Sequence, residues 1–482
     1  MSLKNKAVSG VFWTFLQQFS SQLIIFVVSL VLARLLSPAE FGLIGMISIL
    51  IGIGRVIIDG GLTQSIIRLE NPDDDDYSTV FYFNLVVSVL IYAILFFSAP
   101  LVADFFHQKI LINVIRLYSL SLIISSFSAV QFTRLTKKLM FKSQMFIILP
   151  SIIISGLAGI IMAYNGFGVW SLVYSEIIKA FLTTIQIFFY SKWLPNFYFK
   201  KGKLKQHVGF GLNMTLTSII NVSFKNIYTI FIGRLYSPML LGFYSRADLL
   251  KQLPASNIIF ALNKVTFPIF VSIQDDEEKL RLAYKKVMQM VTFLMAPTMI
   301  FMIVLAEPIF RFLFTSKWLP AVPYFQILAL ISIFQPIQSY NLNILLVKGK
   351  SKIYLYLEIL KKSIILLTIL VTFKFGIIAL LYGQVGLEVL FYILNSYFAG
   401  KYINYKTFSQ FSDIFLILLF SVSCGLIVYM ADSFVFKMFL NDFLRIFVGL
   451  FLGYGLFILF SFLTKSVILY EFKQFLIKKN KN

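Results

Sequence analysis

Long apolar stretches alternate with short polar connections along almost the whole chain. A helix needs about 20 mainly apolar residues to cross the hydrocarbon core of a bilayer. Fourteen stretches reach this length, near residues 11–33, 41–62, 79–103, 111–132, 143–164, 166–190, 208–232, 239–260, 286–306, 321–346, 353–373, 376–399, 412–431 and 444–464. Because a helix satisfies its own backbone hydrogen bonds in lipid, the pattern predicts an all-α polytopic membrane protein with 14 transmembrane helices.

One short motif occurs twice, 200 residues apart. LARLLSPAEFGLIG begins at Leu32, and IGRLYSPMLLGFYS begins at Ile232. Six helices separate the copies, so the repeat predicts two six-helix lobes of the same orientation, related by an axis along the membrane normal. We therefore expect an N-terminal lobe at 1–200 and a C-terminal lobe at 201–405. Residues 406–482 are expected to add two extra helices and a basic cytoplasmic tail.

Composition and charge support a membrane protein. Of the 482 residues, 59% are hydrophobic and only 13% charged, whereas soluble domains carry roughly 25% charged residues. The formal net charge is +22. If the N-terminus is cytoplasmic and the helices alternate, more than half of the 43 Lys and Arg residues fall on the cytoplasmic side, as positive-inside topology requires. The basic charge is thus explained by anchoring to an anionic leaflet, and no nucleic-acid partner is expected.

Few residues are available for metal or acid–base chemistry. The single cysteine, Cys424, lies in an apolar run, and the chain has only two histidines. We therefore expect no disulfide, no metal site and no cofactor. The acidic run NPDDDD, which ends at Asp76, is interpreted as a solvated loop.

Polar residues form a stripe on the seventh predicted helix and have counterparts on the first. The stripe comprises Asn213, Thr217, Asn221 and Lys225, and the residues 200 positions before Thr217 and Asn221 are Gln17 and Ser21. Steps of four keep side chains on one side of a helix. The uncharged members could line a cavity or form hydrogen bonds between helices. Lys225 is costly in lipid unless it faces water or a partner.

The second and eighth predicted helices carry charges near the presumed seam between the lobes. Arg55 and Asp59 stand four residues apart, and Arg246, Asp248 and Lys251 follow the second copy of the motif. Glycines and a proline nearby loosen these helices. The charges favour a solvated cationic cavity, and structural ion pairing is the alternative.

Other charges in apolar stretches fall into two kinds. Two groups have local partners and are interpreted as structural pairs: Glu176 with Lys179, and Glu358 with Lys361 and Lys362. Arg116 and Glu388 have no local partner, and a lone membrane glutamate is a candidate for ion coupling. The candidate coupling residues are Asp59, Asp248 and Glu388.

A cationic cavity selects an anion, and both lysine and arginine suit phosphate groups. The simplest ligand for such a cavity in a membrane is an amphiphile with an anionic head. The residues alone do not specify a sugar.

The segment VFWTFLQQFSSQLIIFVVSLVLARLLSPAEFGLIGMISIL, followed by DGGLTQSIIR, resembles the start of Wzx-type polysaccharide exporters. These exporters belong to the multidrug/oligosaccharidyl-lipid/polysaccharide flippase superfamily, and the colanic-acid and lipopolysaccharide (O-antigen) exporter branch is the most similar. The resemblance implies a V-shaped bundle in the bacterial cytoplasmic (inner) membrane that moves an undecaprenyl-diphosphate-linked oligosaccharide between leaflets by alternating access. It also implies membrane lipids and the polysaccharide polymerase machinery as partners. The diphosphate would meet Arg55, Lys225, Arg246 and Lys251, and the sugar would lie against the polar stripe.

Two other functions stay open. A cation-coupled multidrug antiporter of the same superfamily would need acidic, aromatic pockets, whereas the predicted cavity is basic. A membrane glycan polymerase or ligase would need a substantial outer loop carrying acid–base groups, and the predicted outer loops are short. A transporter without enzymatic activity is therefore expected.

Overall fold

The described part of the chain consists of helices and short connections, without a strand. The structure is a computed structural model that describes the backbone of residues 3–464 and the side chains of 9–10, 12–255 and 266–464. The predicted basic tail at 465–482 lies outside the described residues. The chain divides into two compact units, Met1–Gly242 and Phe243–Asn482. The lobes drawn from the repeat at residue 200 stay a prediction.

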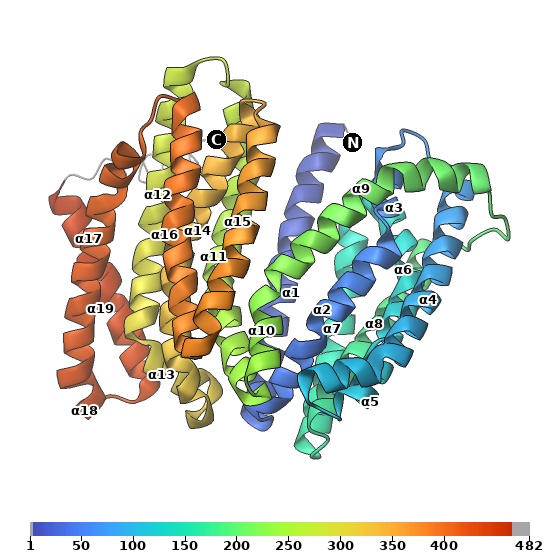
Figure 1. Ribbon diagram of the computed structural model, residues 1–482, viewed down its shortest axis with the longest axis horizontal. Coiled ribbons are helices and arrows are strands. Elements are labelled where there is room, and N and C mark those ends of the chain that lie inside the picture. The colour runs from blue at the N-terminus through green and yellow to red at the C-terminus, as the bar shows by residue number, and fades with distance from the viewer. Residues whose placement is uncertain (1–2, 465–482) are drawn as a thin grey trace. The chain divides into compact units, whose positions relative to one another are not determined.

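The first unit is a bundle in which α7 packs between α1 and α8, α8 packs on α6, α6 on α4, and α4 on α2 (Figure 1). Helix α9 covers α2, α3 and α4. The helices are α1 (Leu3–Leu35), α2 (Pro38–Asp59), α3 (Leu62–Arg68), α4 (Asp74–Phe106), α5 (Leu111–Tyr118), α6 (Leu120–Lys137), α7 (Phe141–Tyr164), α8 (Val169–Ser191), α9 (Lys201–Lys225) and α10 (Ile227–Leu235). Helix α11 (Pro238–Ser272) begins in this unit and continues into the second.

The second unit is built around α12, which packs on α14 and α17, while α14 packs on α16 and α16 on α15. Its helices are α12 (Glu277–Val304), α13 (Ala306–Phe314), η1 (Ser316–Ala321), α14 (Val322–Val347), α15 (Ser351–Thr372), η2 (Phe373–Phe375), α16 (Ile377–Tyr402), α17 (Thr407–Ala431), η3 (Asp432–Phe436), α18 (Lys437–Phe439) and α19 (Asp442–Leu463). The buried Arg445 pairs with Asp432, with nitrogen–oxygen distances of 2.9 and 2.8 Å, and thereby joins α19 to the end of α17.

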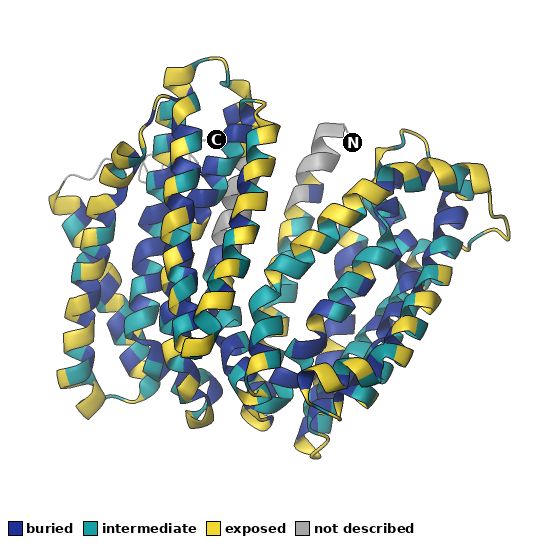
Figure 2. Cartoon of the chain, viewed as in Figure 1, coloured by how far each residue is buried: buried dark blue, intermediate teal, exposed yellow. Residues whose placement is uncertain are grey.

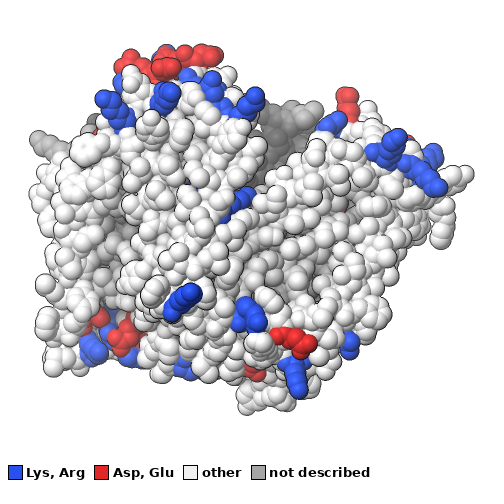
Figure 3. All heavy atoms as spheres, in the orientation of Figure 1, with Lys and Arg blue, Asp and Glu red and all other residues white. Residues whose placement is uncertain are grey.

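Eleven helical segments of the described residues are long and apolar enough to cross a membrane. Large apolar side chains such as Phe97, Leu101 and Phe189 are more than 70% exposed, which suits contact with lipid. Figure 2 shows the buried positions on the inner faces of the helices, and Figure 3 shows charged side chains gathered towards the helix ends with few between. The all-α membrane fold predicted from the sequence is confirmed.

Three further long segments fall outside these eleven: α9 with α10, α11, and α15. Each of these three segments carries charged residues, which lower its mean hydropathy. Helix α9 begins with the basic run KGKLKQH, and α15 contains Glu358 and Lys361. The count of 14 transmembrane helices and the repeat of the two lobes therefore stay predictions.

The repeated motif starts a helix in both copies. Pro38 and Pro238 are the first residues of α2 and α11, where a proline loses no helical hydrogen bond. The backbone N–H of Ser37 donates to Glu40 at 2.6 Å in a capping box. In the second copy the hydroxyl oxygen of Ser237 accepts from the backbone N–H of Leu240 at 3.3 Å. The motif thus sets where both helices begin.

The glycine of each copy allows the first turns of α2 and α11 to cross in backbone contact. A Cβ atom on Gly42 would lie 1.8 Å from the carbonyl oxygen of Pro238, and one on Gly242 would lie 1.8 Å from that of Pro38. Real Cβ atoms never approach a backbone oxygen so closely, so only glycine fits at either position. The two motif copies are therefore packed on each other within the first unit.

The acidic run is not the solvated loop that we expected. Asp73 and Asp76 cap α4 reciprocally, with backbone N–H to carboxylate distances of 2.9 and 3.0 Å. Lys203, near the start of α9, pairs with both carboxylates, and Lys200 pairs with Asp75. We call Asp73–Asp76 the acidic turn. It joins the start of α4 to the basic start of α9, and Asp76 is only 4% exposed.

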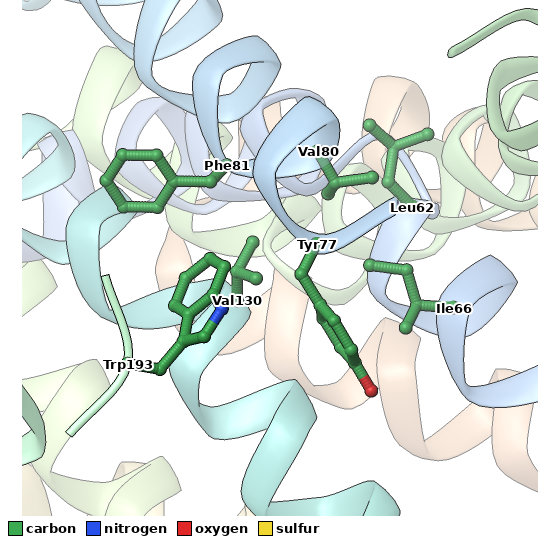
Figure 4. Close-up of a cluster of buried hydrophobic side chains, with 7 residues drawn as sticks. All are labelled: Leu62, Ile66, Tyr77, Val80, Phe81, Val130 and Trp193. Carbon is green, nitrogen blue, oxygen red and sulfur yellow. The ribbon is translucent and has the colours of Figure 1, made fainter. Parts of the chain in front are cut away.

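The buried His207 of α9 extends this attachment. Its Nε2 lies 3.3 Å from the carboxylate of Asp76, and its Nδ1 lies 2.9 Å from the hydroxyl of Ser65. Beside them is a hydrophobic cluster of Leu62, Ile66, Tyr77, Val80, Phe81, Val130 and Trp193 (Figure 4). Since His207 is fully buried, the hydroxyl, imidazole and carboxylate hold helices together and are not accessible to a substrate.

Adding a methyl group at the motif crossing is expected to destabilise the fold. Gly42→Ala and Gly242→Ala should each lower the free energy of unfolding by about 1–3 kcal/mol or more, because the new Cβ displaces a backbone carbonyl. Thermal melting of the purified protein in detergent measures this. The control is Gly455→Ala in α19, where a Cβ meets no atom within 4 Å and alanine favours the helix by up to about 1 kcal/mol. Equal melting temperatures for all three variants would contradict the crossing.

The acidic turn predicts a pH-dependent contribution to stability. The hydrogen bond from Lys203 lowers the pKa of Asp73 from 3.8 to about 2. The ionised carboxylate therefore stabilises the folded state above pH 4, and this stabilisation is lost as the pH falls through about 2. Asp73→Asn should melt below the wild type at pH 7, and the difference should shrink between pH 4 and pH 2. Asp275→Asn, at an exposed site, should show no such trend. A pH-independent difference at Asp73 would disprove the pairing.

Candidate functional site

The first unit holds a charged cluster between α2 and α8. Arg55 of α2 donates to the carboxylate of Glu176 at 2.7 Å, and Glu176 also pairs with Lys179 one turn later on α8. The carboxylate side chain is only 15% exposed, whereas Arg55 is 52% and Lys179 is 38% exposed. Two cations thus share one shielded carboxylate, and both keep accessible surface. We call Arg55, Glu176 and Lys179 the first-unit cluster.

A small hollow adjoins this cluster. A cavity of about 260 Å³ is lined by Glu176, Lys179 and Tyr118, together with apolar side chains of α1, α2, α7 and α8. Tyr118 interacts electrostatically with Glu176 and Arg55. Lys179 of the cluster therefore lies next to space that a polar group can enter.

Although they stand four residues apart, Arg55 and Asp59 use different partners. Asp59 is the last residue of α2, and its carboxylate accepts hydrogen bonds from Thr63 and from the backbone of Gly61. It therefore stabilises the turn into α3. This frees Arg55 to pair with Glu176, which is 121 positions away in the chain. The predicted structural pair of Glu176 with Lys179 is confirmed.

The polar stripe on α9 is exposed along its length. Asn213, Thr217, Asn221 and Lys225 are all exposed, and the hydroxyl of Thr217 donates to the carbonyl of Asn213 at 2.9 Å. Lys225 is the last residue of α9, and the helix is interrupted at Asn226 before α10 begins. The stripe and its lysine are thus available to a ligand.

The counterparts on α1 are less accessible. Gln17 and Ser21 are half-buried. The buried hydroxyl oxygen of Ser21 has no hydrogen-bond partner among the described residues. The role of both residues stays a prediction.

The second unit holds a separate charged cluster on α11, α15 and α16. Lys251 pairs with Asp248 at 3.0 Å, and Lys361 pairs with Glu358 as predicted. Both lysines also interact electrostatically with Glu388. We call Asp248, Lys251, Glu358, Lys361 and Glu388 the second-unit cluster. It sets two ammonium groups against three carboxylates.

Glu388 is not the isolated carboxylate that we expected. The side-chain amide of Gln338 donates to both its carboxylate and its backbone carbonyl. The side-chain amide of Asn395 donates to the amide oxygen of Gln338 at 3.3 Å. The amide oxygen of Asn395 is buried and has no hydrogen-bond partner in the described part of the chain. Glu388 therefore belongs to a polar network that is incompletely satisfied.

Arg246 of α11 is buried against aromatic rings. It is 4% exposed, and its guanidinium lies over the rings of Phe314 and Trp318, 5.2 and 5.1 Å from their centroids. Such cation–π contacts stabilise a desolvated cation by about 2 kcal/mol. Of the four predicted diphosphate ligands, Arg55 and Lys225 are thus open, Lys251 is paired and Arg246 is enclosed by aromatic rings.

The sequence did not indicate that the locally paired Glu176 and Lys361 also contact other helices, and Gln338 was not selected. Glu176 pairs with Arg55 121 positions away, and Gln338 donates to Glu388 50 positions away. Lys361 interacts with Glu388 of another helix, so no local spacing indicates these contacts. The only signal in the sequence was their position inside apolar stretches, where charge is costly.

Comparisons with known proteins agree with this architecture. The model of the polysaccharide biosynthesis protein family matches residues 31–323. The chain is 23% identical over 418 residues to the lipopolysaccharide biosynthesis protein WzxC of Escherichia coli, covering 85% of this chain and 84% of WzxC. It is 26% identical over 319 residues to the succinoglycan biosynthesis transport protein ExoT of Rhizobium meliloti, covering 66% and 64%.

Solved structures show the same fold. An inward closed structure of the lipid II flippase MurJ superimposes with a TM-score of 0.74 at 16% identity, covering 95% of this chain and 100% of MurJ. An inward-facing multidrug transporter of the MATE family superimposes with a TM-score of 0.62 at 14% identity, covering 80% and 96%.

The fold and the sparse charge thus define a polytopic membrane protein. More particularly, the chain belongs to the polysaccharide biosynthesis protein family, since the family model covers more than half of it. The resemblance to Wzx-type exporters noted in the sequence is confirmed.

Proposed function

We propose that this protein is a flippase for an undecaprenyl-diphosphate-linked oligosaccharide in surface polysaccharide biosynthesis. It would act in the bacterial cytoplasmic membrane, with both termini cytoplasmic, by alternating access. The observation that carries the proposal is an accessible excess of positive charge on the apolar helices of a polysaccharide biosynthesis protein. A cation held in such a place is costly unless it meets water or an anion.

The diphosphate meets Arg55 first in this mechanism. Glu176 fixes one nitrogen of the Arg55 guanidinium. The rest of the guanidinium remains accessible to phosphate oxygens. Lys225 supplies a second charge from the interruption after α9. The exposed amide and hydroxyl groups of the α9 stripe suit the hydroxyls of the sugar.

Lys251 and Arg246 are less available to the diphosphate than Arg55 and Lys225. Both stay candidate ligands, but each would first have to leave its present partners, Asp248 and the aromatic rings. The polymerase machinery stays a predicted partner.

Coupling to a cation is assigned to the second-unit cluster. Asp248 and Glu358 each pair with a lysine of this cluster, whereas the Glu388 carboxylate accepts from the neutral amide of Gln338 and keeps its negative charge when ionised. A proton or a metal cation on Glu388 would remove it. Release of that cation would restore the charge and drive a change of conformation.

A multidrug antiporter is the second candidate, because the second-unit cluster is acidic and the fold also occurs in the MATE family. The match to the polysaccharide biosynthesis family and the cationic first-unit cluster favour the lipid-linked glycan.

Removing an open cation is expected to slow flipping. The test uses purified protein in liposomes carrying an undecaprenyl-diphosphate-linked disaccharide, with arrival at the far leaflet detected by an added glycosidase. Arg55→Ala and Lys225→Ala should each reduce the rate about tenfold, equivalent to about 1.4 kcal/mol of activation free energy. Folding should persist in Arg55→Ala, because Glu176 retains Lys179.

Lys374→Ala is the matched control, since Lys374 is an exposed lysine on η2 that belongs to neither cluster. This variant should flip at the wild-type rate. Unchanged rates in both test variants would remove Arg55 and Lys225 from the substrate path. Failure of the wild type with every lipid-linked glycan, while it exchanges drug cations, would favour the antiporter.

Neutralising Glu388 should abolish coupling. In the same liposomes an imposed pH gradient or sodium gradient should accelerate flipping by the wild type. Glu388→Gln should flip at one rate with and without the gradient, because its charge no longer changes. Glu278→Gln, which removes an exposed carboxylate of α12, should keep the acceleration. The assignment fails if Glu388→Gln responds to the gradient as the wild type does.

A further inference from the structure

One cavity of the first unit is lined by aromatic rings and lies apart from the residues assigned above. It has a volume of about 540 Å³ and is walled by α4, α5, the start of α8 and the connection before α8. Its aromatic residues are Tyr92, Phe96, Phe167, Trp170 and Tyr174. Figure 1 shows α5 at the end of the unit opposite the acidic turn and α3. We call it the aromatic cavity, and its volume is typical of small-ligand sites.

Arg116 brings a cation with free donors into this cavity. Its Nε donates to the carbonyl oxygen of Phe96 at 3.3 Å, and its guanidinium lies over the Phe96 ring, 4.3 Å from the centroid. These contacts fix the side chain. The two terminal nitrogens have no partner in the part of the chain that the structure describes, so a fixed fork of donors is available to a bound molecule.

The rest of the lining fits an anionic, ring-shaped ligand. Asn113 is exposed at the cavity and adds amide donor and acceptor groups. None of the nine lining residues is acidic, so an anion meets no like charge there. A guanidinium fork matches a carboxylate in a bidentate manner.

Aromatic rings contribute the second half of the recognition. Tyr92 and Phe96 have ring centroids 5.9 Å apart, and those of Trp170 and Tyr174 are 6.4 Å apart, giving two aromatic walls. The C–H faces of a pyranose ring pack on aromatic faces, while its hydroxyls require donors and acceptors. A sugar ring that carries a carboxylate therefore uses every element of the lining, whereas an acyl chain leaves Arg116 and Asn113 unsatisfied.

We propose that the aromatic cavity binds an acidic sugar residue, such as a hexuronic acid, with Arg116 holding the carboxylate and Trp170 stacking on the ring. This inference rests on the proposed function for its role. With a cytoplasmic N-terminus, the cavity lies at the outer end of the first unit. It would therefore receive the saccharide part of the lipid-linked substrate as that part leaves the membrane.

Binding can be tested separately from transport. The purified full-length protein in lipid nanodiscs is titrated calorimetrically with two disaccharides, cellobiouronic acid (a glucuronic acid linked to glucose) and its neutral counterpart cellobiose. The acidic disaccharide should bind at least tenfold more tightly than the neutral one. Arg116→Gln and Trp170→Leu should each weaken its binding tenfold or more, with unchanged melting temperatures showing that both variants fold.

The matched control is Arg68→Gln. Arg68 also lies over a phenylalanine ring, Phe210, at 4.6 Å, but outside the cavity, so binding should equal that of the wild type. Equal binding of the acidic and neutral disaccharides, or no binding of either to the folded protein, overturns the proposal. So does retention of a copurifying anionic phospholipid that Arg116→Gln releases, because a lipid headgroup would then be the occupant.

The outcomes also separate this inference from the proposed function. If the wild type flips the lipid-linked disaccharide but binds no acidic sugar, the cavity assignment fails and the flippase stands. If the acidic sugar binds and depends on Arg116 but no flipping occurs, the cavity assignment stands alone.

Discussion

A charged side chain on an otherwise apolar helix must find a partner or water, and this constraint governs how the chain uses its sparse charge. An isolated charge in the hydrocarbon region costs several kcal/mol. Arg55 is therefore fixed by Glu176, Lys251 by Asp248, and Arg246 by two aromatic rings. The net charge that remains after this pairing differs between the units. The first-unit cluster has one cation in excess, and the second-unit cluster has one carboxylate in excess. In the proposed mechanism the substrate anion binds at the first-unit cluster, and the coupling cation binds at the second-unit cluster.

Backbone contact provides the frame on which these charges are placed. At the motif crossing, glycine brings α2 and α11 together closely enough that no side chain fits. Arg55 follows one of these glycines on α2, and Asp248 and Lys251 follow the other on α11. At the opposite end of α9, the acidic turn fixes its basic start to α4. The exposed polar stripe of α9 lies between that attachment and the interruption at Asn226.

The sequence predicted the elements of the fold better than the contacts of the site. Runs of apolar residues located the helices, and the Ser-Pro pairs marked where α2 and α11 begin, because both signals are local. Local spacing also predicted Glu176 with Lys179 and Glu358 with Lys361 correctly. The four-residue spacing of Arg55 and Asp59, however, could not indicate that the Asp59 carboxylate is used by the following turn. Glu388 appeared isolated for the same reason, since Gln338 lies on another helix. The acidic turn appeared solvated because its lysines follow more than 120 residues later.

The most direct measurement of the central claim is retention of substrate by the purified protein. Native mass spectrometry can compare an undecaprenyl-diphosphate-linked disaccharide with the same disaccharide joined to undecaprenol without phosphate. The account predicts that the diphosphate form is retained and the neutral form is released, and that rising salt weakens the retention because exposed charges are screened. Equal retention of both forms, or retention of neither, would contradict a cationic substrate site.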